Sequence, residues 1–251
     1  MLRSRIIPCL LLHEGGLVKT RRFEEPKYVG DPLNAVKIFN EKEVDELMFF
    51  DIDATTEGYV PRMTLLRSLA VESRMPLCYG GGVTSAGQAS QIIATGFEKV
   101  SVSAAALARP MLIREMSEEI GAQSVVVTVD VKANRLFTGW TVYTHNGRRK
   151  HKQTLLEFCL LAESLGAGEI VINNIDRDGQ MGGYDLELAC QVRKAINIPM
   201  TVLGGAGSVE HFQELIDAVG TVGAAAGAFF VFKGPYRAVL IHYERPLHLT
   251  T

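Results

Sequence analysis

One carboxylate lies at the end of a β-rich run, where a side chain can move a proton. Asp130 closes the run 124–130 and, because side chains alternate along a strand, it shares a face with Val126 and Thr128. In barrels of parallel strands the carboxyl ends of the strands carry the catalytic residues. Asp130 is therefore a candidate general acid or base, and a carboxylate that only caps a loop is the alternative interpretation.

Two glycine-rich segments have the composition of phosphate-binding turns. Residues 80–82 are Gly-Gly-Gly and residues 204–207 are Gly-Gly-Ala-Gly, and each follows a strand-like run and precedes a helical one. Such turns let backbone N–H groups approach an anion, and residues 227–230 fit the short extra helix that often follows the last barrel strand. Two sites would suit a substrate with a phosphate at each end, whereas tight turns without a ligand are the alternative. The candidates are Gly81, Gly82, Gly204, Gly205, Gly227 and Ala228.

Four charged residues mark the opposite ends of the strand-like runs. Arg5, Glu46, Lys99 and Glu169 all lie at or near the start of a run. Two cations and two anions could form a neutral ring at the amino-terminal end of a barrel, and they must pair because an isolated buried ion costs several kcal/mol. From spacing alone, a ring that serves only stability is the simpler interpretation.

Eight strand-like runs alternate with amphipathic helical stretches and would position these residues. Eight strands in 251 residues leave about 31 residues for each strand and helix, which is typical of a barrel with short loops. The pattern predicts one α/β domain over residues 1–251, a (β/α)8 TIM barrel. The predicted strands are 5–12, 45–52, 76–79, 99–103, 124–130, 169–173, 199–203 and 222–227, and the predicted helices are 31–42, 63–73, 84–95, 110–120, 154–165, 185–196 and 208–219.

The two halves of the chain resemble each other. Residues 75–106 are similar to residues 198–228, and residues 44–54 are similar to residues 168–179, so we expect two half-barrels with two-fold pseudo-symmetry. By this symmetry Leu11 corresponds to Asp130, and leucine cannot move a proton. His13 has the strand parity of Leu11 and is an alternative proton carrier.

Composition excludes several classes of protein. Lys and Arg number 26 against 28 Asp and Glu, a balance that disfavours nucleic-acid binding. No apolar stretch is long enough to span a membrane, and four widely spaced cysteines favour reduced thiols and a cytoplasmic location. Neither metal-ligand spacing nor a dinucleotide fingerprint is present, so we expect no metal and no cofactor. Residues 138–145, with Trp140 and Tyr143, are predicted to form a hairpin over the mouth or to serve packing.

The motifs together resemble the HisF family, the cyclase subunit of imidazole glycerol phosphate synthase. The resemblance runs from Arg5 to about Phe232 and is carried by residues 5–10, 30–32, 45–47, 80–82, 130, 168–170, 175–179, 183–185 and 204–207. It implies a (β/α)8 barrel that pairs with a glutaminase. Ammonia from glutamine would pass along the barrel axis and react at the top with phosphoribulosyl-formimino-aminoimidazole-carboxamide ribotide.

The resemblance also assigns roles to single residues. It implies that the four charged residues form an ammonia gate, that Lys19 lies on a mobile loop after the first strand, and that Asp45, Glu98 and Gln123 face the glutaminase. The phosphate sites would include Ser103, Ala104, Asp178 and Gly179 as well as the glycine turns.

At the mouth the chain departs from the family pattern. Leu11 stands where the family has a catalytic aspartate, Ser103-Ala104 where it usually has Asn-Thr, and Ala228 where it usually has serine. Because each lost neutral hydrogen bond costs roughly 1 kcal/mol, a bisphosphate substrate should bind more weakly.

The substitutions at the mouth, together with the complete set of gate residues, favour one function among three. Residues 11–32 resemble a paralogous branch associated with surface-polysaccharide biosynthesis, which is thought to supply ammonia to an enzyme that makes an acetamidino sugar. The leading hypothesis is an ammonia-conducting barrel that partners a glutaminase and an ATP-dependent amidating enzyme. The alternatives are a working cyclase in which Asp130, with His13 as a second candidate, carries the protons, and a regulatory barrel that senses a phosphorylated small molecule.

Overall fold

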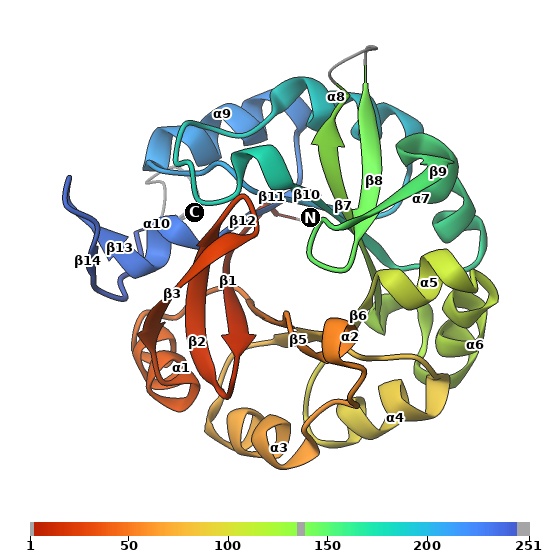
Figure 1. The fold of residues 1–251 in the computed structure, drawn as a ribbon, viewed down its shortest axis with the longest axis horizontal. Coiled ribbons are helices and arrows are strands. Elements are labelled where there is room, and N and C mark those ends of the chain that lie inside the picture. The colour runs from red at the N-terminus through yellow and green to blue at the C-terminus, as the bar shows by residue number, and fades with distance from the viewer. Residues whose placement is uncertain (1–2, 135–138, 245–251) are drawn as a thin grey trace.

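The computed structural model describes residues 3–134 and 139–244. Eight parallel strands close into a barrel, because β1 pairs with both β12 and β4 and the ladder is completed by the pairing of β7 with β10. Helices surround this barrel (Figure 1). The barrel strands are β1 (Arg5–His13), β4 (Leu47–Asp51), β5 (Leu77–Gly80), β6 (Lys99–Val102), β7 (Val125–Ala133), β10 (Glu169–Asn174), β11 (Met200–Leu203) and β12 (Gly223–Ala226).

Every predicted helix is present, and no predicted end differs from the observed one by more than two residues. Asp31 and Asp185 cap α1 and α8 by accepting bonds from Asn34 N and Leu188 N. Ser85 caps α4 by accepting a bond from Gln88 N, and the N–H of the preceding Thr84 donates to Gln88 Oε1. The helices are α1 (Pro32–Glu41), α2 (Ala54–Glu57), α3 (Met63–Glu72), α4 (Ala86–Ala94), α5 (Ala104–Ala108), α6 (Met111–Ile120), α7 (Leu155–Ser164), α8 (Leu186–Ala195), α9 (Val209–Val219) and α10 (Ala228–Val231), with 3-10 turns η1 (Ala122–Ser124) and η2 (Ile175–Arg177).

Two β-hairpins extend from the barrel at its carboxyl-terminal end. β1 continues into β2 (Gly16–Arg21) and β3 (Glu24–Gly30), while β7 continues into β8 (Trp140–Thr144) and β9 (Arg149–Thr154). Figure 1 shows them on opposite sides of the mouth. The first hairpin was not predicted, and the second lies where a hairpin was expected, although Thr138 of that prediction falls outside the described residues. A small sheet of β13 (Phe232–Lys233) and β14 (Ala238–Val239) follows α10.

Apolar side chains fill the fold in two separate clusters. The larger one lies between strands and helices, and the smaller one fills the barrel interior with Ile7, Cys9, Met48, Cys78, Val126, Val171, Leu203 and Ala225. The cysteines of the described chain are free thiols. In the part of the chain that the structure describes, no helix has the length and apolarity that a membrane crossing requires.

Two-fold pseudo-symmetry is visible in the glycine turns. A Cβ on Gly81 would lie 2.4 Å from the backbone oxygen of Asp51 at the end of β4, and a Cβ on Gly204 would lie 2.7 Å from that of Asn174 at the end of β10. Both glycines also have a positive φ, so each turn requires glycine for the same reason. The two turns are therefore built alike and can be compared directly.

Candidate functional site

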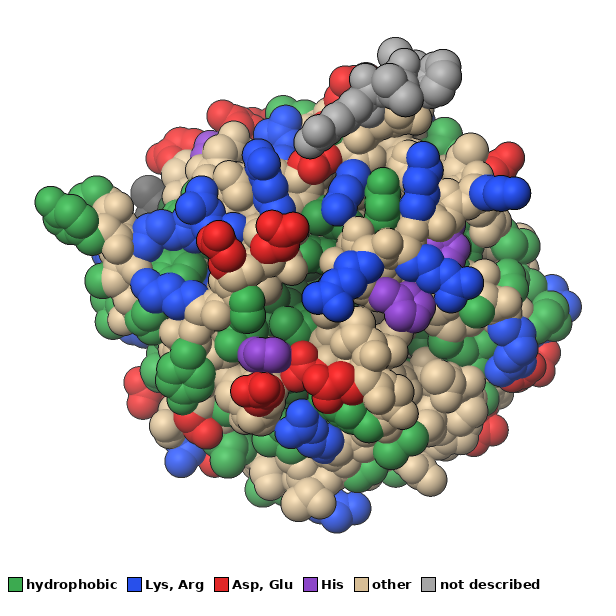
Figure 2. Space-filling model, in the orientation of Figure 1, with side chains coloured by type: hydrophobic (Ala, Val, Ile, Leu, Met, Phe, Trp, Pro, Cys, Tyr) green, Lys and Arg blue, Asp and Glu red, His purple; other side chains and the backbone are tan. Residues whose placement is uncertain are grey.

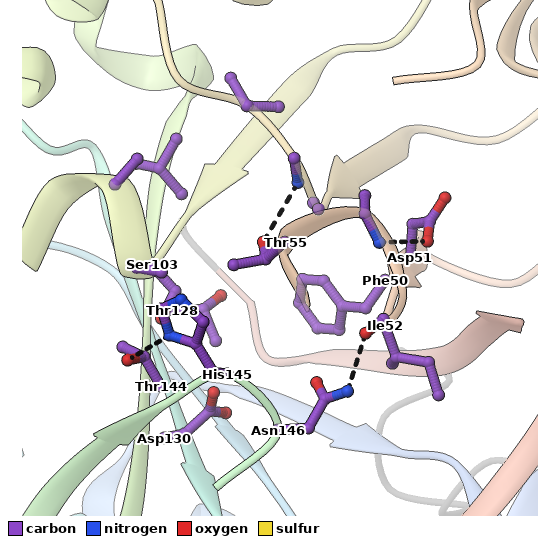
Figure 3. A pocket seen from close by; sticks show the side chains of 18 of the residues that line it. Phe50, Asp51, Ile52, Thr55, Ser103, Thr128, Asp130, Thr144, His145 and Asn146 are labelled. Atoms are coloured by element: carbon purple, nitrogen blue, oxygen red, sulfur yellow. Dashed lines mark hydrogen bonds between the residues drawn. The ribbon is translucent and has the colours of Figure 1, made fainter. Parts of the chain in front are cut away.

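A cavity of about 580 Å³ opens at the carboxyl-terminal ends of β4 to β7. The ends of these strands form its floor and the β8–β9 hairpin forms one wall (Figure 3). The hairpin reaches across the mouth, because Asn146 Nδ2 donates to the backbone oxygen of Ile52 at 2.8 Å. This position is the usual location of a small-molecule site in such barrels.

Asp130 lies in this cavity and has a perturbed carboxyl group. Asn173 on β10 donates to Asp130 Oδ1 at 2.9 Å. Burial raises the pKa of Asp130 to about 7, although the bond from Asn173 works in the opposite direction, while the charge of Asp178 adds to the rise. Near neutral pH this carboxyl group can therefore either donate or accept a proton. The oxygen of the same amide, Asn173 Oδ1, is buried without a hydrogen-bond partner among the described residues.

The residues around Leu11 do not replace the missing carboxylate in a simple way. Leu11 lines the same cavity as Asp130. Asp51 also lines it, but Asp51 Oδ1 accepts bonds from two backbone N–H groups and from the hydroxyl of Tyr59. His13 instead bonds Asp53 at 2.7 Å and is not among the cavity residues. This hydrogen bond to Asp53 is the main reason that the pKa of His13 is raised.

The first glycine turn faces the cavity. Gly81, Gly82, Ser103 and Ala104 all line it. Gly82 N–H donates to Thr55 Oγ1 at 3.4 Å, and the buried Ser103 hydroxyl has no hydrogen-bond partner among the described residues. A ligand in the cavity would therefore meet an unused hydroxyl beside the turn.

The second glycine turn surrounds a space of only about 10 Å³. Gly204, Gly205, Gly227 and Ala228 border this space together with Lys19, Asp178 and Gly179. Lys19 was expected on a mobile loop, but it lies in β2 with a buried side chain that forms an ion pair with Asp178. The residues predicted for this turn thus lie side by side, and the buried side chain of Lys19 lies among them.

Basic and polar side chains of the β8–β9 hairpin were missed by the sequence analysis. His145, Asn146, Arg149 and His151 line the cavity. Thr144 Oγ1 links the two histidine rings, at 2.9 Å from His145 Nδ1 and 2.8 Å from His151 Nε2. Burial, followed by the charges of Arg149 and His145, lowers the pKa of His151. The His and Arg residues clustered at 145–151 are the feature of the sequence that could have predicted this wall of the cavity.

Figure 2 shows how charge is distributed around the mouth. Basic and histidine side chains gather to the right of the central hollow, and acidic side chains lie below and to the left of it. Trp140, predicted to lie over the mouth or to serve packing, is half-buried and donates from Nε1 to Asp185 Oδ2 at 3.2 Å. It is not among the cavity residues, so its contact with the start of α8 supports the packing role.

At the amino-terminal end of the barrel, Arg5, Glu46, Lys99 and Glu169 form one cluster, here called the ion ring. Lys99 Nζ donates to Glu46 Oε2 and to Glu169 Oε2, each at 2.8 Å. Arg5 bonds Glu46 as well, and bonds Glu169 Oε1 at 2.7 Å. The two carboxylates are almost fully buried, with side chains 2% and 3% exposed. Each cation therefore bridges both anions.

The two glutamates of the ion ring differ in their hydrogen bonding. Burial alone would raise the pKa of Glu169, but Lys99 and Arg5 outweigh it and lower that pKa to about 2. Thr201 Oγ1 adds a further donor at 2.5 Å. Burial raises the pKa of Glu46 despite the same cations, and Glu46 Oε1 has no hydrogen-bond partner among the described residues. Glu46 is therefore the carboxyl group of the ring that is more easily protonated.

Apolar side chains fill the barrel interior between the ion ring and the mouth. On β1 the inward residues after Arg5 are Ile7, Cys9 and Leu11, because alternate residues of a strand share a face. Burial raises the pKa of Cys9 to about 12, so its thiol is neutral. An unpaired ion would lose its hydration among these side chains, whereas an uncharged molecule would not carry that cost.

The three residues predicted to face a glutaminase lie at the same end as the ion ring. Glu98 and Gln123 are exposed at the starts of β6 and η1. Asp45 is mostly buried, accepting a bond from Ile6 N at 2.9 Å and one from Arg3 at 3.2 Å. Its hydrogen bonds join β1 to the segment before β4. Among the described residues, no group of three His, Cys, Asp or Glu side chains could hold a metal ion.

The closed barrel and its mouth cavity define a (β/α)8-barrel protein with a small-molecule site at the carboxyl ends of its strands. The chain belongs to the histidine biosynthesis protein family, whose model matches residues 5–236, and within that family it is HisF-like.

Its relatives carry names of imidazole glycerol phosphate synthase subunits. The chain is 51% identical to a hisF3 subunit of Vibrio vulnificus strain YJ016, over 98% of this chain and 95% of the relative. It is 46% identical to a hisF2 subunit of Pseudomonas aeruginosa, over 97% and 96%. Both names mark the assignment as provisional. A HisF subunit of Lysinibacillus sphaericus, named without that mark, is 38% identical over 98% and 97% of the two chains.

Proposed function

We propose that this chain is the ammonia-conducting subunit of a complex with a glutaminase, and that it supplies ammonia to a separate amidating enzyme. The observation that carries the proposal is the contrast between the two ends of the barrel. The ion ring is complete at one end, while Leu11 accompanies Asp130 in the cavity at the other.

The ion ring supports passage of ammonia better than a purely structural role. In a ring that served only stability, every buried polar atom should have a hydrogen-bond partner, because a buried polar atom without one is destabilising. Glu46 Oε1 nevertheless lacks a partner among the described residues, although Oε2 of the same carboxylate bonds both Arg5 and Lys99. Ammonia can donate a hydrogen bond to such an oxygen and then enter the apolar interior in its neutral form.

The side chains at the mouth support the proposal that cyclase activity is low. Positioned acid–base catalysis contributes about 10²- to 10⁴-fold to a reaction rate, and leucine supplies none of it. His13 is engaged by Asp53, and Asp51 accepts three hydrogen bonds. Neither residue near position 11 therefore supplies the second proton carrier that an aspartate at that position would provide.

The partners follow from the two ends of the barrel and from family resemblance. A glutaminase would dock around the exposed Glu98 and Gln123, beside the ion ring. An ATP-dependent amidating enzyme of surface-sugar biosynthesis would receive ammonia at the mouth, as the similarity of residues 11–32 to the polysaccharide-associated branch suggests.

Reconstitution with the cognate glutaminase tests the proposal. With amide-labelled glutamine, the label should appear in the product of the amidating enzyme only when the barrel is present. With phosphoribulosyl-formimino-aminoimidazole-carboxamide ribotide as the acceptor, turnover should be lower than that of an intact cyclase by about 10²-fold or more. Turnover equal to that of an intact cyclase would overturn the proposal.

Docking of the glutaminase has its own test. Glu98→Lys should abolish co-purification of the glutaminase, whereas Glu187→Lys, which changes an exposed residue on α8, should leave it intact. Equal binding by both variants would place the glutaminase elsewhere.

A working cyclase is the second candidate, and the pKa of Asp130 near 7 favours it. In that case Asp130→Asn abolishes imidazole glycerol phosphate formation and Leu11→Asp changes it little. Under the leading proposal Leu11→Asp raises cyclase activity. Complementation of a histidine auxotroph separates the two candidates.

A further inference from the structure

The β8–β9 hairpin brings two histidines to the wall of the mouth cavity. His145 and His151 both line the cavity that Asp130 lines. Tyr143 of β8 is the strand partner of Asp130, and His145 follows two residues later. Figure 3 shows Thr144 and His145 on the same side of the cavity as Asp130. The hairpin therefore places imidazole rings at the end of the strand that carries the buried carboxyl group.

Thr144 joins the two rings into one hydrogen-bonded chain. Its Oγ1 lies 2.9 Å from His145 Nδ1 and 2.8 Å from His151 Nε2, and the residue is only 1% exposed. A hydroxyl group has one hydrogen, so it donates to one ring and accepts from the other. A proton that arrives at the outer nitrogen of one ring can therefore pass through the hydroxyl to the other ring.

Two contacts hold the tip of the hairpin and so fix the position of His145. Asn146 Nδ2 donates to the backbone oxygen of Ile52 across the mouth at 2.8 Å. Lys132 Nζ donates to the backbone oxygen of Gly147 at 3.2 Å. The ring of His145 is thus held in place before any molecule enters the cavity.

The cavity also contains buried polar atoms that a bound molecule would satisfy. Asn173 is 6% exposed, and its Oδ1 has no hydrogen-bond partner among the described residues. The same amide donates from Nδ2 to Asp130 at 2.9 Å. The buried Ser103 hydroxyl is likewise without a partner among the described residues. Because such atoms are destabilising when left alone, they indicate a polar ligand beside Asp130 and not merely an exit for ammonia.

Few of the described side chains that line the cavity carry charge or titrate. They are Asp51, Tyr59, Asp130, His145, Arg149 and His151. The first two are bonded to each other, and the arginine stays protonated. The carboxyl group of Asp130 and the two imidazole rings remain as the groups that can exchange protons near neutral pH.

The surroundings of His151 suit the outer end of a proton path. Burial, followed by the charges of Arg149 and His145, lowers the pKa of His151, so its ring does not retain a proton at neutral pH. The residue is half-buried at the mouth, where water can take the proton.

We propose that His145, coupled through Thr144 to His151, is a second proton carrier of the mouth, and that it acts with Asp130 on a small carbonyl compound to which ammonia adds. The nitrogen of ammonia bonds to the carbonyl carbon, and the electron pair of the C=O bond moves to oxygen. Protonated Asp130 donates its proton to that oxygen, and His145 Nε2 takes one proton from the nitrogen.

The relay then restores the starting state. His145 passes its Nδ1 proton to Thr144, the hydroxyl passes its own proton to His151, and His151 releases one to water. Asp130 regains a proton from water, so the sum of the steps is the addition of ammonia to the carbonyl group. The inference rests on the proposed function only in that ammonia reaches the mouth, and it assigns the low cyclase turnover expected there to the hairpin.

Steady-state turnover of the full chain with phosphoribulosyl-formimino-aminoimidazole-carboxamide ribotide and ammonium chloride tests the inference without a glutaminase. His145 has a φ of +54°, a conformation that glycine adopts freely. His145→Gly should lower kcat by about tenfold or more and leave KM within about threefold. Imidazole added to the buffer should restore part of the lost kcat, because it can occupy the space of the missing ring. His242→Gly, which removes a histidine outside the cavity, should keep the wild-type kcat with and without imidazole.

Thr144 is a positioning residue in this scheme and has its own readout. Thr144→Val replaces the buried hydroxyl by a methyl group and should lower kcat by about threefold or more with little change in KM. Thr144→Ser, which keeps a hydroxyl, should recover most of the wild-type kcat. Equal kcat values for the valine and serine variants would show that the hydroxyl carries no proton.

Three results would overturn the inference. They are a wild type with no turnover above the reaction without enzyme, a His145→Gly variant with the wild-type kcat, and a loss that imidazole does not reverse. The first of these leaves the proposed ammonia transfer intact, whereas wild-type turnover equal to that of an intact cyclase overturns the proposed function and leaves the role of His145 to the variant. Should His145→Gly fail to fold, His145→Asn, which also tolerates a positive φ, replaces it with the same expected loss of kcat.

Discussion

Removal of Lys99 gives a sharp test of the ion ring. Lys99 lies 2.8 Å from one oxygen of each buried glutamate, so Lys99→Met leaves two buried carboxylates with Arg5 as the only cation of the ring. Loss of one partner from a buried ion pair typically costs about 3 to 5 kcal/mol. The free energy of unfolding, measured with urea near neutral pH, should fall by about that amount.

The loss should also depend on pH in a defined direction. Without Lys99, the pKa of Glu46, which burial already raises, rises further in the folded state. A carboxyl group whose folded pKa lies above its unfolded pKa contributes most stability at low pH and loses it as pH rises through the folded pKa. The destabilisation should therefore be larger at about pH 8 than at about pH 5.

Two control variants make the result interpretable. Arg109→Met removes an exposed ion pair with Glu115, which should cost at most about 1 kcal/mol. Lys99→Met/Glu46→Gln leaves Arg5 with one carboxylate and should recover part of the lost stability and most of the pH dependence. A loss of stability for Lys99→Met that is no larger than that for Arg109→Met, or that is equal at both pH values, would refute the inference that the buried glutamates depend on Lys99 for their charge.

Three further predictions concern other parts of the chain and use the free energy of unfolding. Asp130→Asn should stabilise the fold by about 2 to 4 kcal/mol at about pH 8 and by less than half of that at pH 5, because burial raises the pKa of Asp130 to about 7 and the cost of the buried carboxylate grows between its unfolded and folded pKa; equal effects at both pH values would contradict it. Gly81→Ala should destabilise by about 2 kcal/mol or more, since its Cβ would meet Asp51 at 2.4 Å with φ at +123°, whereas Gly87→Ala on α4, which meets nothing within 4 Å, should be neutral or stabilising. Thr154→Ala, which removes the capping box of α7, should cost about 1 kcal/mol, and no change would show that the cap is dispensable.

The ion ring could be predicted because it depends on strand parity alone. Arg5, Lys99 and Glu169 each begin a barrel strand, and Glu46 immediately precedes one. In a closed barrel the first inward side chains of the strands meet on the axis. Once eight parallel strands were predicted, the meeting of these four charges followed without knowledge of any loop.

The ion pair of Lys19 with Asp178 could not be predicted in the same way. Lys19 reaches Asp178 only because a hairpin folds back over the loop after β10, and the two residues are far apart in the sequence. Most residues of β3 are polar and exposed, so this part of the hairpin lacks the alternation of apolar and polar residues that would have predicted a strand. The same limit applies to His145 and Arg149, whose contact with the cavity depends on the direction of the β8–β9 hairpin rather than on its existence.

Leu11 affects the mouth beyond the loss of a proton carrier. An ionised carboxylate near the end of an ammonia path stabilises ammonium, because opposite charges attract in a low-dielectric site. Burial raises the pKa of Asp130 to about 7, so its carboxyl group is only partly ionised near neutral pH, and Leu11 adds no charge. Under the proposed function, the low negative charge allows ammonia to leave the interior in its neutral, nucleophilic form. An aspartate at position 11 would improve cyclisation and retain ammonium at the same time, so the substitution by leucine suits a barrel that passes ammonia onward.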